Sequence, residues 1–448
     1  MARPGAVAAI VSLGWPMFIG QLAVMANGLV DMVMAGHLSA DDLAAVAIGS
    51  SVYFVVYVGM MGSLQSISPV AAQHFGARRM REVGETWRQG QWMAAMLGAP
   101  GLILLAFPAP LLSLTQSSEA VQAGAIQYLQ GVAWGLPAAL WFRAFSTLNA
   151  AVSRTRLVMA INLLGPALKV PLNALFMHGS DGPVAVGLPA LPALGGAGCG
   201  WATAVVYWIS AGIGLVVLRR SRFYAPFSIR GLGRPHWPRL AKLFRLGLPI
   251  GGMYLIDVSA FNLMTLLVAR LGTATVGGHA IASNMAALLY MLPMAMASAT
   301  SVLAAQAIGR GDSREAVSVA NTGVALISTL AAVCALGLFM LRETVAQAYT
   351  DRDEVALIAA GLLAWVALYH LLDALQCGLA FVLRAWKVAV LPMVIFALAL
   401  WGVGLGGGTW LALGLELGAP GFWIAAILAL MCSAVALALL YRRTVRSH

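Results

Sequence analysis

Charged side chains are scarce in this sequence. Only 10% of the 448 residues are charged, whereas 61% are hydrophobic; a soluble domain usually carries about 25% charged residues. A soluble protein of this length has too little interior to bury so much apolar surface. The composition therefore excludes a soluble globular protein and predicts a chain whose solvent is the lipid bilayer.

Cysteines and metal-ligand clusters are also scarce. The four cysteines lie in apolar stretches and form no C-x-x-C pair, so we expect small packed side chains rather than disulfides or metal ligands. The sequence has no histidine cluster, no aspartate-rich prenyl-diphosphate motif and no phosphate-binding loop. These absences argue against a membrane-embedded transferase or protease and against an ATP-driven pump. We therefore predict that the protein is not an enzyme and needs no cofactor.

Apolar segments of membrane-spanning length recur along the whole chain. The predicted spans are 7–33, 44–72, 90–113, 123–150, 157–178, 198–218, 241–268, 275–305, 316–341, 356–382, 388–412 and 420–441. An even number of spans places both termini on one side of the membrane. We therefore predict an all-α integral membrane protein with twelve transmembrane helices.

The basic residues indicate which side the termini occupy. Most of the 27 lysines and arginines fall at the termini or in the connections that follow even-numbered spans, and the acidic residues favour the opposite connections. Basic residues collect in cytoplasmic loops, so both termini should lie in the cytoplasm. The net charge of +11 then reflects membrane topology, and we expect the lipid bilayer, not nucleic acid, as a partner.

The second half of the chain repeats the first. A shift of 233 residues, the distance from Pro16 to Pro249, also aligns the block Ala-Ala-Gln-x-x-Gly at 71–76 with the same block at 304–309. Because each repeat holds six spans, both repeats start on the same side of the membrane. A pseudo-twofold axis along the membrane normal should therefore relate two six-helix bundles.

The repeat predicts how the chain is divided and where it bends. The predicted lobes are 1–218 and 241–448, joined by a basic, proline-containing cytoplasmic linker at 219–240. Such folds place the substrate site between the lobes near the bilayer midplane. Pro16 and Pro249 each remove a backbone hydrogen bond from their helix. We predict a hinge at each proline, although packing alone could also explain two kinks.

Two carboxylates lie deep within predicted spans of the second half. An ionisable side chain at the bilayer centre costs about 2.5–3.5 kcal/mol on insertion scales. Helical spacing puts Asp257 near the face of Met253, Tyr254 and Phe261. Asp373 lies one turn after Tyr369. Two acids in one low-dielectric cavity should hold a proton, a metal cation or an organic cation; the alternative is that structural hydrogen bonds neutralise each of them.

The first half holds ionisable residues of both signs. Asp31 lies late in the first span, and Lys169 lies one turn before Asn173 in the fifth. If Lys169 is deep, the economical hypothesis is an ion pair with Asp31; near an interface it would instead extend its ammonium to the surface. Arg143 either faces the cavity or braces helix packing.

Six motifs spread along the chain form a recognisable set. They are the Ala-Ala-Gln-x-x-Gly block, GLVDMVMAG at 28–36, VPLN at 170–173, LGGAG at 194–198, GLPI at 247–250 and GHAIASN at 278–284. Together they resemble the multidrug and toxic compound extrusion (MATE) transporters, in the bacterial NorM-like branch. The resemblance covers essentially the whole chain.

The resemblance implies a secondary active multidrug efflux transporter that exchanges cationic lipophilic compounds for protons or sodium ions by alternating access. It implies coupling and substrate roles for Asp257, Asp373, Tyr369 and Asp31, with any bound Na+ at the first two. The family roles carry over to these positions only; separately, we predict that a further set of residues lines the cavity or modulates it, namely Lys169, Asn173, Asn284, Phe261 and Met253. The implied setting is the bacterial cytoplasmic (inner) membrane, where a monomer would export organic cations such as drugs and dyes.

Two positions depart from the family pattern. The fifth span reads Lys169-x-x-x-Asn173 where the family often has two asparagines, which puts an ammonium where a first-half cation could sit. Ala280 follows His279 where this branch often has glutamine, which would alter drug contacts. A lipid-linked flippase of the wider superfamily remains the alternative, but it would need a cationic cavity for phosphates, and the second-half cavity is acidic.

Overall fold

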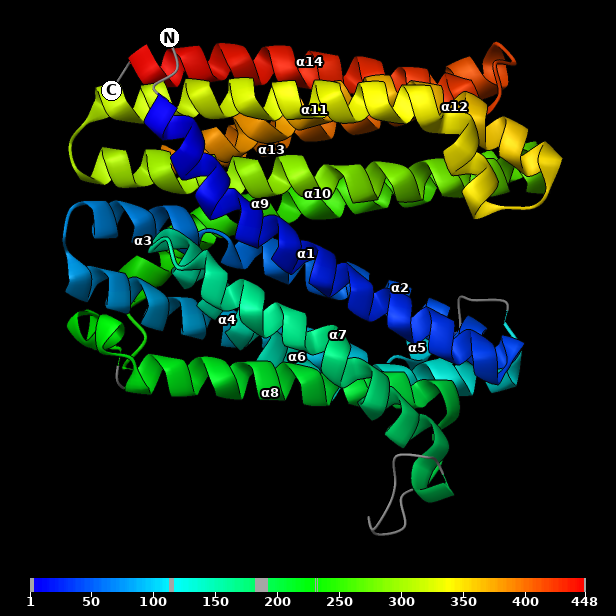
Figure 1. Cartoon of the computed structure of the whole chain (residues 1–448), viewed down its shortest axis with the longest axis horizontal. Helices are drawn as coiled ribbons and strands as arrows, with labels where there is room; N and C mark the ends of the chain where they lie inside the picture. The colour runs from blue at the N-terminus through cyan, green and yellow to red at the C-terminus, as the bar shows by residue number, and fades with distance from the viewer. Residues whose placement is uncertain (1–3, 113–116, 182–191, 230, 232, 447–448) are drawn as a thin grey trace. The chain divides into compact units, whose positions relative to one another are not determined.

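The computed structural model describes residues 4–112, 117–181, 192–229, 231 and 233–446, and all regular elements within them are helices (Figure 1). The first half contains α1 (Pro4–Leu38), α2 (Ala40–Leu64), α3 (Ile67–Gly76), α4 (Met80–Ala106), α5 (Ala109–Leu112), α6 (Glu119–Ala151), α7 (Thr155–His178), η1 (Gly179–Asp181), η2 (Gly195–Ala197), α8 (Gly198–Arg220) and η3 (Arg222–Phe227). The second half contains α9 (Trp237–Val268), η4 (Ala269–Leu271), α10 (Thr273–Gly309), α11 (Ser313–Tyr349), α12 (Asp353–Ala385), α13 (Val390–Ala397), η5 (Leu398–Gly407), η6 (Trp410–Gly414) and α14 (Ala419–Arg446).

Each predicted span corresponds to a helix or to a run of consecutive helices. Ten helical segments in the described part of the chain are long and apolar enough to cross a membrane; α2 with α3 forms one of them, and α13 with η5 and η6 forms another. The remaining two spans are α4 and α6, which have 27 and 33 residues but fall short of the same apolarity. The predicted all-α architecture of twelve transmembrane helices is confirmed.

The span predicted at 90–113 was wrong at both ends, and its start lies ten residues earlier, because α4 begins at Met80. The span predicted at 90–113 ends early, because α4 stops at Ala106 and a separate short helix follows at Ala109–Leu112. Phe107 leaves the helical conformation with φ −122° and ψ 62°. It precedes Pro108, and the residue before a proline is disfavoured in helical geometry. Apolarity alone could not reveal this break.

The chain forms two compact units. In each repeat, the first part of the first helix belongs to the unit that the other repeat mainly builds. One unit consists of Ile19–Phe75 and Arg79–Gly251; the other consists of Met1–Phe18, Gly76–Arg78 and Gly252–His448. The boundaries cut α1 between residues 18 and 19 and cut α9 between residues 251 and 252. These two cuts are repeat-equivalent, since a shift of 233 residues superimposes them. The start of each repeat therefore packs in the unit built mainly by the other repeat.

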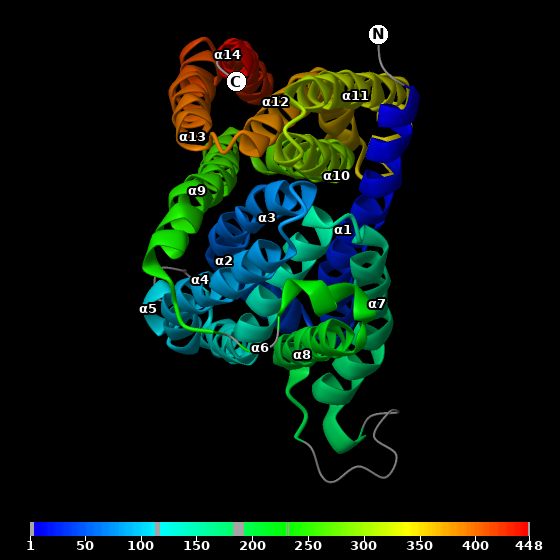
Figure 2. The ribbon, with the colours of Figure 1, turned by 90° about the vertical axis from the view of Figure 1, so that its left-hand side faces the viewer.

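In the unit containing most of the first half, α6 is central and packs against α2, α4 and α8. Figures 1 and 2 show α6 and α8 side by side. Small residues bring these two helices together: an ideal Cβ on Gly131 would lie 2.8 Å from the Trp201 backbone nitrogen, and one on Gly135 would lie 2.7 Å from the Ala204 Cα. Such close crossings are typical of membrane helices, where packing replaces the hydrophobic effect.

In the unit containing most of the second half, α12 is central and packs against α10, α11 and α14. The first part of α1 belongs to this unit, and an ideal Cβ on Gly14 would lie 2.7 Å from the Met296 sulfur of α10. Trp423 of α14 is completely buried. The contact between α12 and α14 is therefore part of the buried core of this unit.

The linker predicted at 219–240 is fixed to the first-half helices. The buried Tyr224 hydroxyl donates a 2.6 Å hydrogen bond to Oδ1 of Asn149 on α6. The Arg154 guanidinium stacks 3.9 Å above the Phe223 ring. The Gln89 side chain of α4 binds both the Arg234 carbonyl and the His236 amide. The described part of the connection therefore belongs to one unit; residues 230 and 232 lie outside the described residues.

Candidate functional site

Two carboxylates in the second half interact electrostatically, and within the described residues neither has a basic partner. Asp257 is carried by α9 and Asp373 by α12, and they are near enough to interact electrostatically. Both are half-buried. Within the described residues neither forms an ion pair or a hydrogen bond. The structural hydrogen bonds considered as the alternative are therefore not found in the described part of the chain.

An aromatic cluster, Phe261, Tyr369 and Trp423, lies beside these carboxylates. Tyr369 is only 4% exposed and interacts electrostatically with both Asp373 and Asp257. Its ring lies 6.0 Å from that of Phe261 and 5.5 Å from that of Trp423, both edge-on. Phe261 follows Asp257 by one turn, so α9 presents a carboxylate and an aromatic ring on one face. The predicted face shared by Asp257 and Phe261 is therefore present.

Trp423 of the aromatic cluster and Tyr290, which interacts with Asp373, could not be picked out of the sequence. Trp423 is one of many apolar residues in α14, and only the packing of α14 on α12 places it against Tyr369. Tyr290 of α10 interacts electrostatically with Asp373, although it lies in a methionine-rich apolar run. A tyrosine in such a run carries no sequence signal beyond its position within a span.

Met253, Asn284 and His279 also lie in the second half, and the His279 ring lies 5.8 Å from that of Trp423 in the aromatic cluster. Met253 is buried. The exposed Asn284 of α10 accepts a 2.8 Å hydrogen bond from the Tyr349 hydroxyl. His279 bonds the hydroxyls of Thr265 and Ser283 through Nε2, at 3.2 and 3.3 Å. Asn284 and His279 therefore already use hydrogen-bonding capacity within the protein.

The first-half charges form the predicted ion pair. Lys169 Nζ of α7 lies 3.1 Å from Asp31 Oδ2 of α1, and the residues are 1% and 6% exposed. Asn173 is fully buried and donates a 2.8 Å hydrogen bond from Nδ2 to Oδ1 of Asp31. Lys169 is therefore buried within the protein, and its ammonium is held by Asp31 instead of extending to a surface.

Two residues of α8 complete the surroundings of this ammonium. Lys169 donates to the Cys199 carbonyl at 3.2 Å and to the Thr203 hydroxyl. Thr203 in turn donates to the Cys199 carbonyl at 2.8 Å. The sequence motifs did not include Thr203, because a threonine within a membrane helix normally bonds its own backbone and marks no site.

Arg143 of α6 has no carboxylate partner within the described residues. Its buried Nε has no hydrogen-bond acceptor there, and its guanidinium is near enough to interact electrostatically with Tyr57 of α2. Tyr57 stacks on Tyr53 with ring centroids 5.5 Å apart. Arg143 therefore lies beside aromatic hydroxyls, and not in an ion pair.

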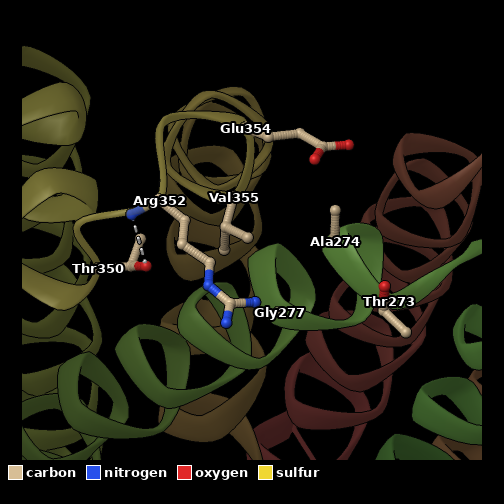
Figure 3. A pocket seen from close by; sticks show the side chains of 7 residues that line it. All are labelled: Thr273, Ala274, Gly277, Thr350, Arg352, Glu354 and Val355. Carbon is tan, nitrogen blue, oxygen red and sulfur yellow. Dashed lines mark hydrogen bonds between the residues drawn. The ribbon is translucent and has the colours of Figure 1, made fainter.

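A pocket of about 350 Å³ lies at the first turns of α10 and α12 (Figure 3). Its lining residues are Thr273, Ala274, Gly277, Thr350, Arg352, Glu354 and Val355. The Arg352 amide donates to the Thr350 hydroxyl at 3.2 Å, and the guanidinium extends toward Gly277 (Figure 3). Neither Asp257 nor Asp373 lines this pocket, so it is separate from the carboxylate pair.

Histidine, cysteine, aspartate and glutamate do not gather in groups of three or more able to hold a metal ion among the described residues. The chemistry available around Asp257 and Asp373 is two carboxylates and a phenol. These are oxygen groups, which suit a proton or a hard cation.

Comparison with known proteins gives the family. The MatE family model matches residues 16–175 and 249–410, so its two matches begin at the repeat-equivalent prolines. The probable multidrug resistance protein NorM of Aromatoleum aromaticum is 38% identical over 96% of this chain and 93% of its own length. The protein of the same name from Neisseria meningitidis serogroup B is 35% identical over 98% of this chain and 95% of its own length.

Solved structures show the same fold. The eukaryotic MATE transporter AtDTX14 matches with a TM-score of 0.88 at 17% identity, over 99% of this chain and 98% of its own. A multidrug resistance MATE family transporter of the MOP superfamily, in an outward-facing conformation, matches with a TM-score of 0.86 at 18% identity, over 100% and 99%. The family model, the relatives and the fold agree, and the chain belongs to the MatE family of multi-pass membrane transporters.

Proposed function

We propose that this protein is a secondary active multidrug efflux transporter that exchanges cationic lipophilic compounds for protons or sodium ions by alternating access. The supporting observation is the carboxylate pair of Asp257 and Asp373, which has no cationic or hydrogen-bonding partner within the described residues. Two such groups side by side in a low-dielectric setting repel one another when both are charged. Binding of a cation relieves that repulsion, whether the cation is the coupling ion or the substrate.

Coupling follows from competition for the same charge. A proton or Na+ at Asp257 and Asp373 neutralises the attraction for an organic cation, and the organic cation opposes binding of the ion. Tyr369 interacts electrostatically with both carboxylates, and we propose that its phenol adds a polar group to the binding surroundings of the cation. Asp31 is also proposed to affect coupling, but its carboxylate already has Lys169 as partner.

The aromatic cluster supports a lipophilic cation as the substrate. Rings attract a cation over their faces and also bury its apolar surface. Phe261 and Tyr369 provide such rings within reach of the carboxylate pair. We propose that Met253, Asn284, Lys169 and Asn173 influence the cavity around the substrate. We also propose a monomer in the bacterial inner membrane, with both termini in the cytoplasm.

Transport in proteoliposomes tests this function. Purified protein should export ethidium when a proton gradient or a sodium gradient is imposed, and applying each gradient alone should identify the coupling ion. Liposomes without protein provide the control for passive leakage. Absence of gradient-driven ethidium movement under both conditions would refute secondary antiport.

We propose hinges at Pro16 and Pro249, which lie inside α1 and α9. The unit boundaries fall two residues after each proline, at residues 18 and 251. Pro249→Ala permits the missing backbone hydrogen bond and should stiffen α9. We expect a several-fold lower efflux rate with unchanged ethidium binding, measured by transport and by fluorescence titration.

Pro100→Ala provides the matched control, because Pro100 also lies inside a helix, α4, that none of the unit boundaries cuts. It should leave efflux near the wild-type rate. Equal losses in the two variants would show that the effect of Pro249 is general destabilisation and not a hinge.

A further inference from the structure

The Lys169 ammonium lies in a shell of oxygen atoms. An ammonium has three N–H donors, and Lys169 directs them to three acceptors: Oδ2 of Asp31 at 3.1 Å, the carbonyl of Cys199 at 3.2 Å and the hydroxyl of Thr203. One acceptor comes from α1 and two come from α8. All donors are thus satisfied at a position where Lys169 is only 1% exposed.

This oxygen shell matches the ligand set of a hard cation. Carboxylate, backbone carbonyl and hydroxyl oxygens are the groups that alkali and alkaline-earth cations prefer in proteins. The second carboxylate oxygen of Asp31 is held by Asn173 at 2.8 Å, which fixes the orientation of the group. Apart from Lys169, no basic side chain forms an ion pair with Asp31 among the described residues.

We propose that the Lys169 ammonium is a tethered resident cation in a monovalent cation site formed by Asp31, the Cys199 carbonyl and Thr203. While Lys169 is present, this site binds no free ion. When Lys169 is replaced by a shorter neutral side chain, the site becomes available to Na+ or a similar alkali ion. Lys169 therefore determines that the first half binds no ion of its own.

The consequence for transport rests on the proposed antiport function. Because the Lys169 ammonium already neutralises Asp31, the first half contributes no ion to the exchange cycle. The number of ions exchanged per substrate then depends on Asp257 and Asp373. Asp31 then affects transport by holding Lys169 and α1 in place. Replacing Lys169 by a shorter neutral side chain should add one ion to each transport cycle and so raise the number of ions exchanged per substrate.

Ion-dependent stability tests the site without requiring transport. The protein carrying Asp257→Asn and Asp373→Asn serves as the background, so that the second-half carboxylates cannot bind the ion. Thermal unfolding is followed in nanodiscs of neutral lipid at pH 8, in NaCl and in choline chloride of equal ionic strength. With Lys169 present, the midpoint should be the same in both salts.

Adding Lys169→Asn to this background should produce a saturable rise of several degrees in NaCl over choline chloride, because an ion that binds only the folded state stabilises it. Adding Asp31→Asn as well should remove that rise, and Thr203→Val should weaken it. A Lys169→Asn protein without any Na+ response would overturn the proposal, and so would a response that survives Asp31→Asn.

The variant could also fail to fold, because it removes the partner of a buried carboxylate. The yield of monodisperse protein extracted in NaCl or in choline chloride is therefore measured in parallel. The proposal requires a higher yield in NaCl, so failure to fold in both salts counts against it. If this test succeeds and ethidium transport is absent, only the antiport function fails.

Discussion

Asp373→Asn is expected to reduce ethidium efflux by at least about tenfold at matched expression. Asparagine has nearly the same shape as aspartate but can neither bind a proton at this position nor attract a cation by charge. Asp257 would remain as the single carboxylate, and the repulsion that makes cation binding favourable would be lost. A loss of about 1.4 kcal/mol in the binding free energy of the coupling ion already weakens its affinity tenfold.

The matched control is Asp353→Asn, the same substitution at the exposed first turn of the same helix α12. It should leave efflux close to that of the unmodified protein. Efflux is measured as the rate of ethidium fluorescence decrease in energised cells, with protein levels determined by immunoblotting. Undiminished efflux in Asp373→Asn would remove this residue from the coupling mechanism.

Gly200→Leu is expected to have the largest effect on folding. An ideal Cβ on Gly200 of α8 would overlap the backbone carbonyl of Tyr128 on α6. A backbone group cannot rotate away as a side chain can, so α6 and α8 must separate along the contact that Gly131 and Gly135 also form. Overpacking of this kind costs about 3 kcal/mol, and we expect a much lower unfolding midpoint and little monodisperse protein.

Gly212→Leu provides a control on the same helix. Nothing lies within 4 Å of an ideal Cβ at Gly212, so the identical side chain enters open space. Differential scanning fluorimetry of both variants should show near-normal stability for Gly212→Leu alone. If the two variants are equally stable, close approach of α6 and α8 is not what holds this bundle together.

The architecture was predictable because its signals extend over many residues. Span length, loop charge and the repeat offset each involve dozens of positions, so local errors such as the early end of α4 at Ala106 did not change the count. The Lys169–Asp31 pair was also predictable, because two opposite charges inside a membrane have few other ways to be compensated. The distance of 3.1 Å confirms that reasoning.

The rest of the candidate site depends on contacts between distant segments. Trp423 reaches Tyr369 only because α14 packs on α12. The Cys199 carbonyl that receives the Lys169 ammonium is a backbone atom, and backbone atoms leave no trace in residue identity. The exchanged starts of α1 and α9 were likewise hidden, because a continuous helix shows no break in its sequence where its packing partner changes.

The exchange of helix starts affects how the protein can be made. Ribosomes add about 5–20 residues per second, so residues 4–18 enter the membrane well before α10, which they pack against, has been synthesised. The unit containing most of the first half is likewise incomplete until residues 237–251, the start of α9, have been synthesised. Neither repeat can finish folding alone during translation. Gene duplication thus produced two halves that must mature together, and cutting the connection between them would not yield two independent proteins.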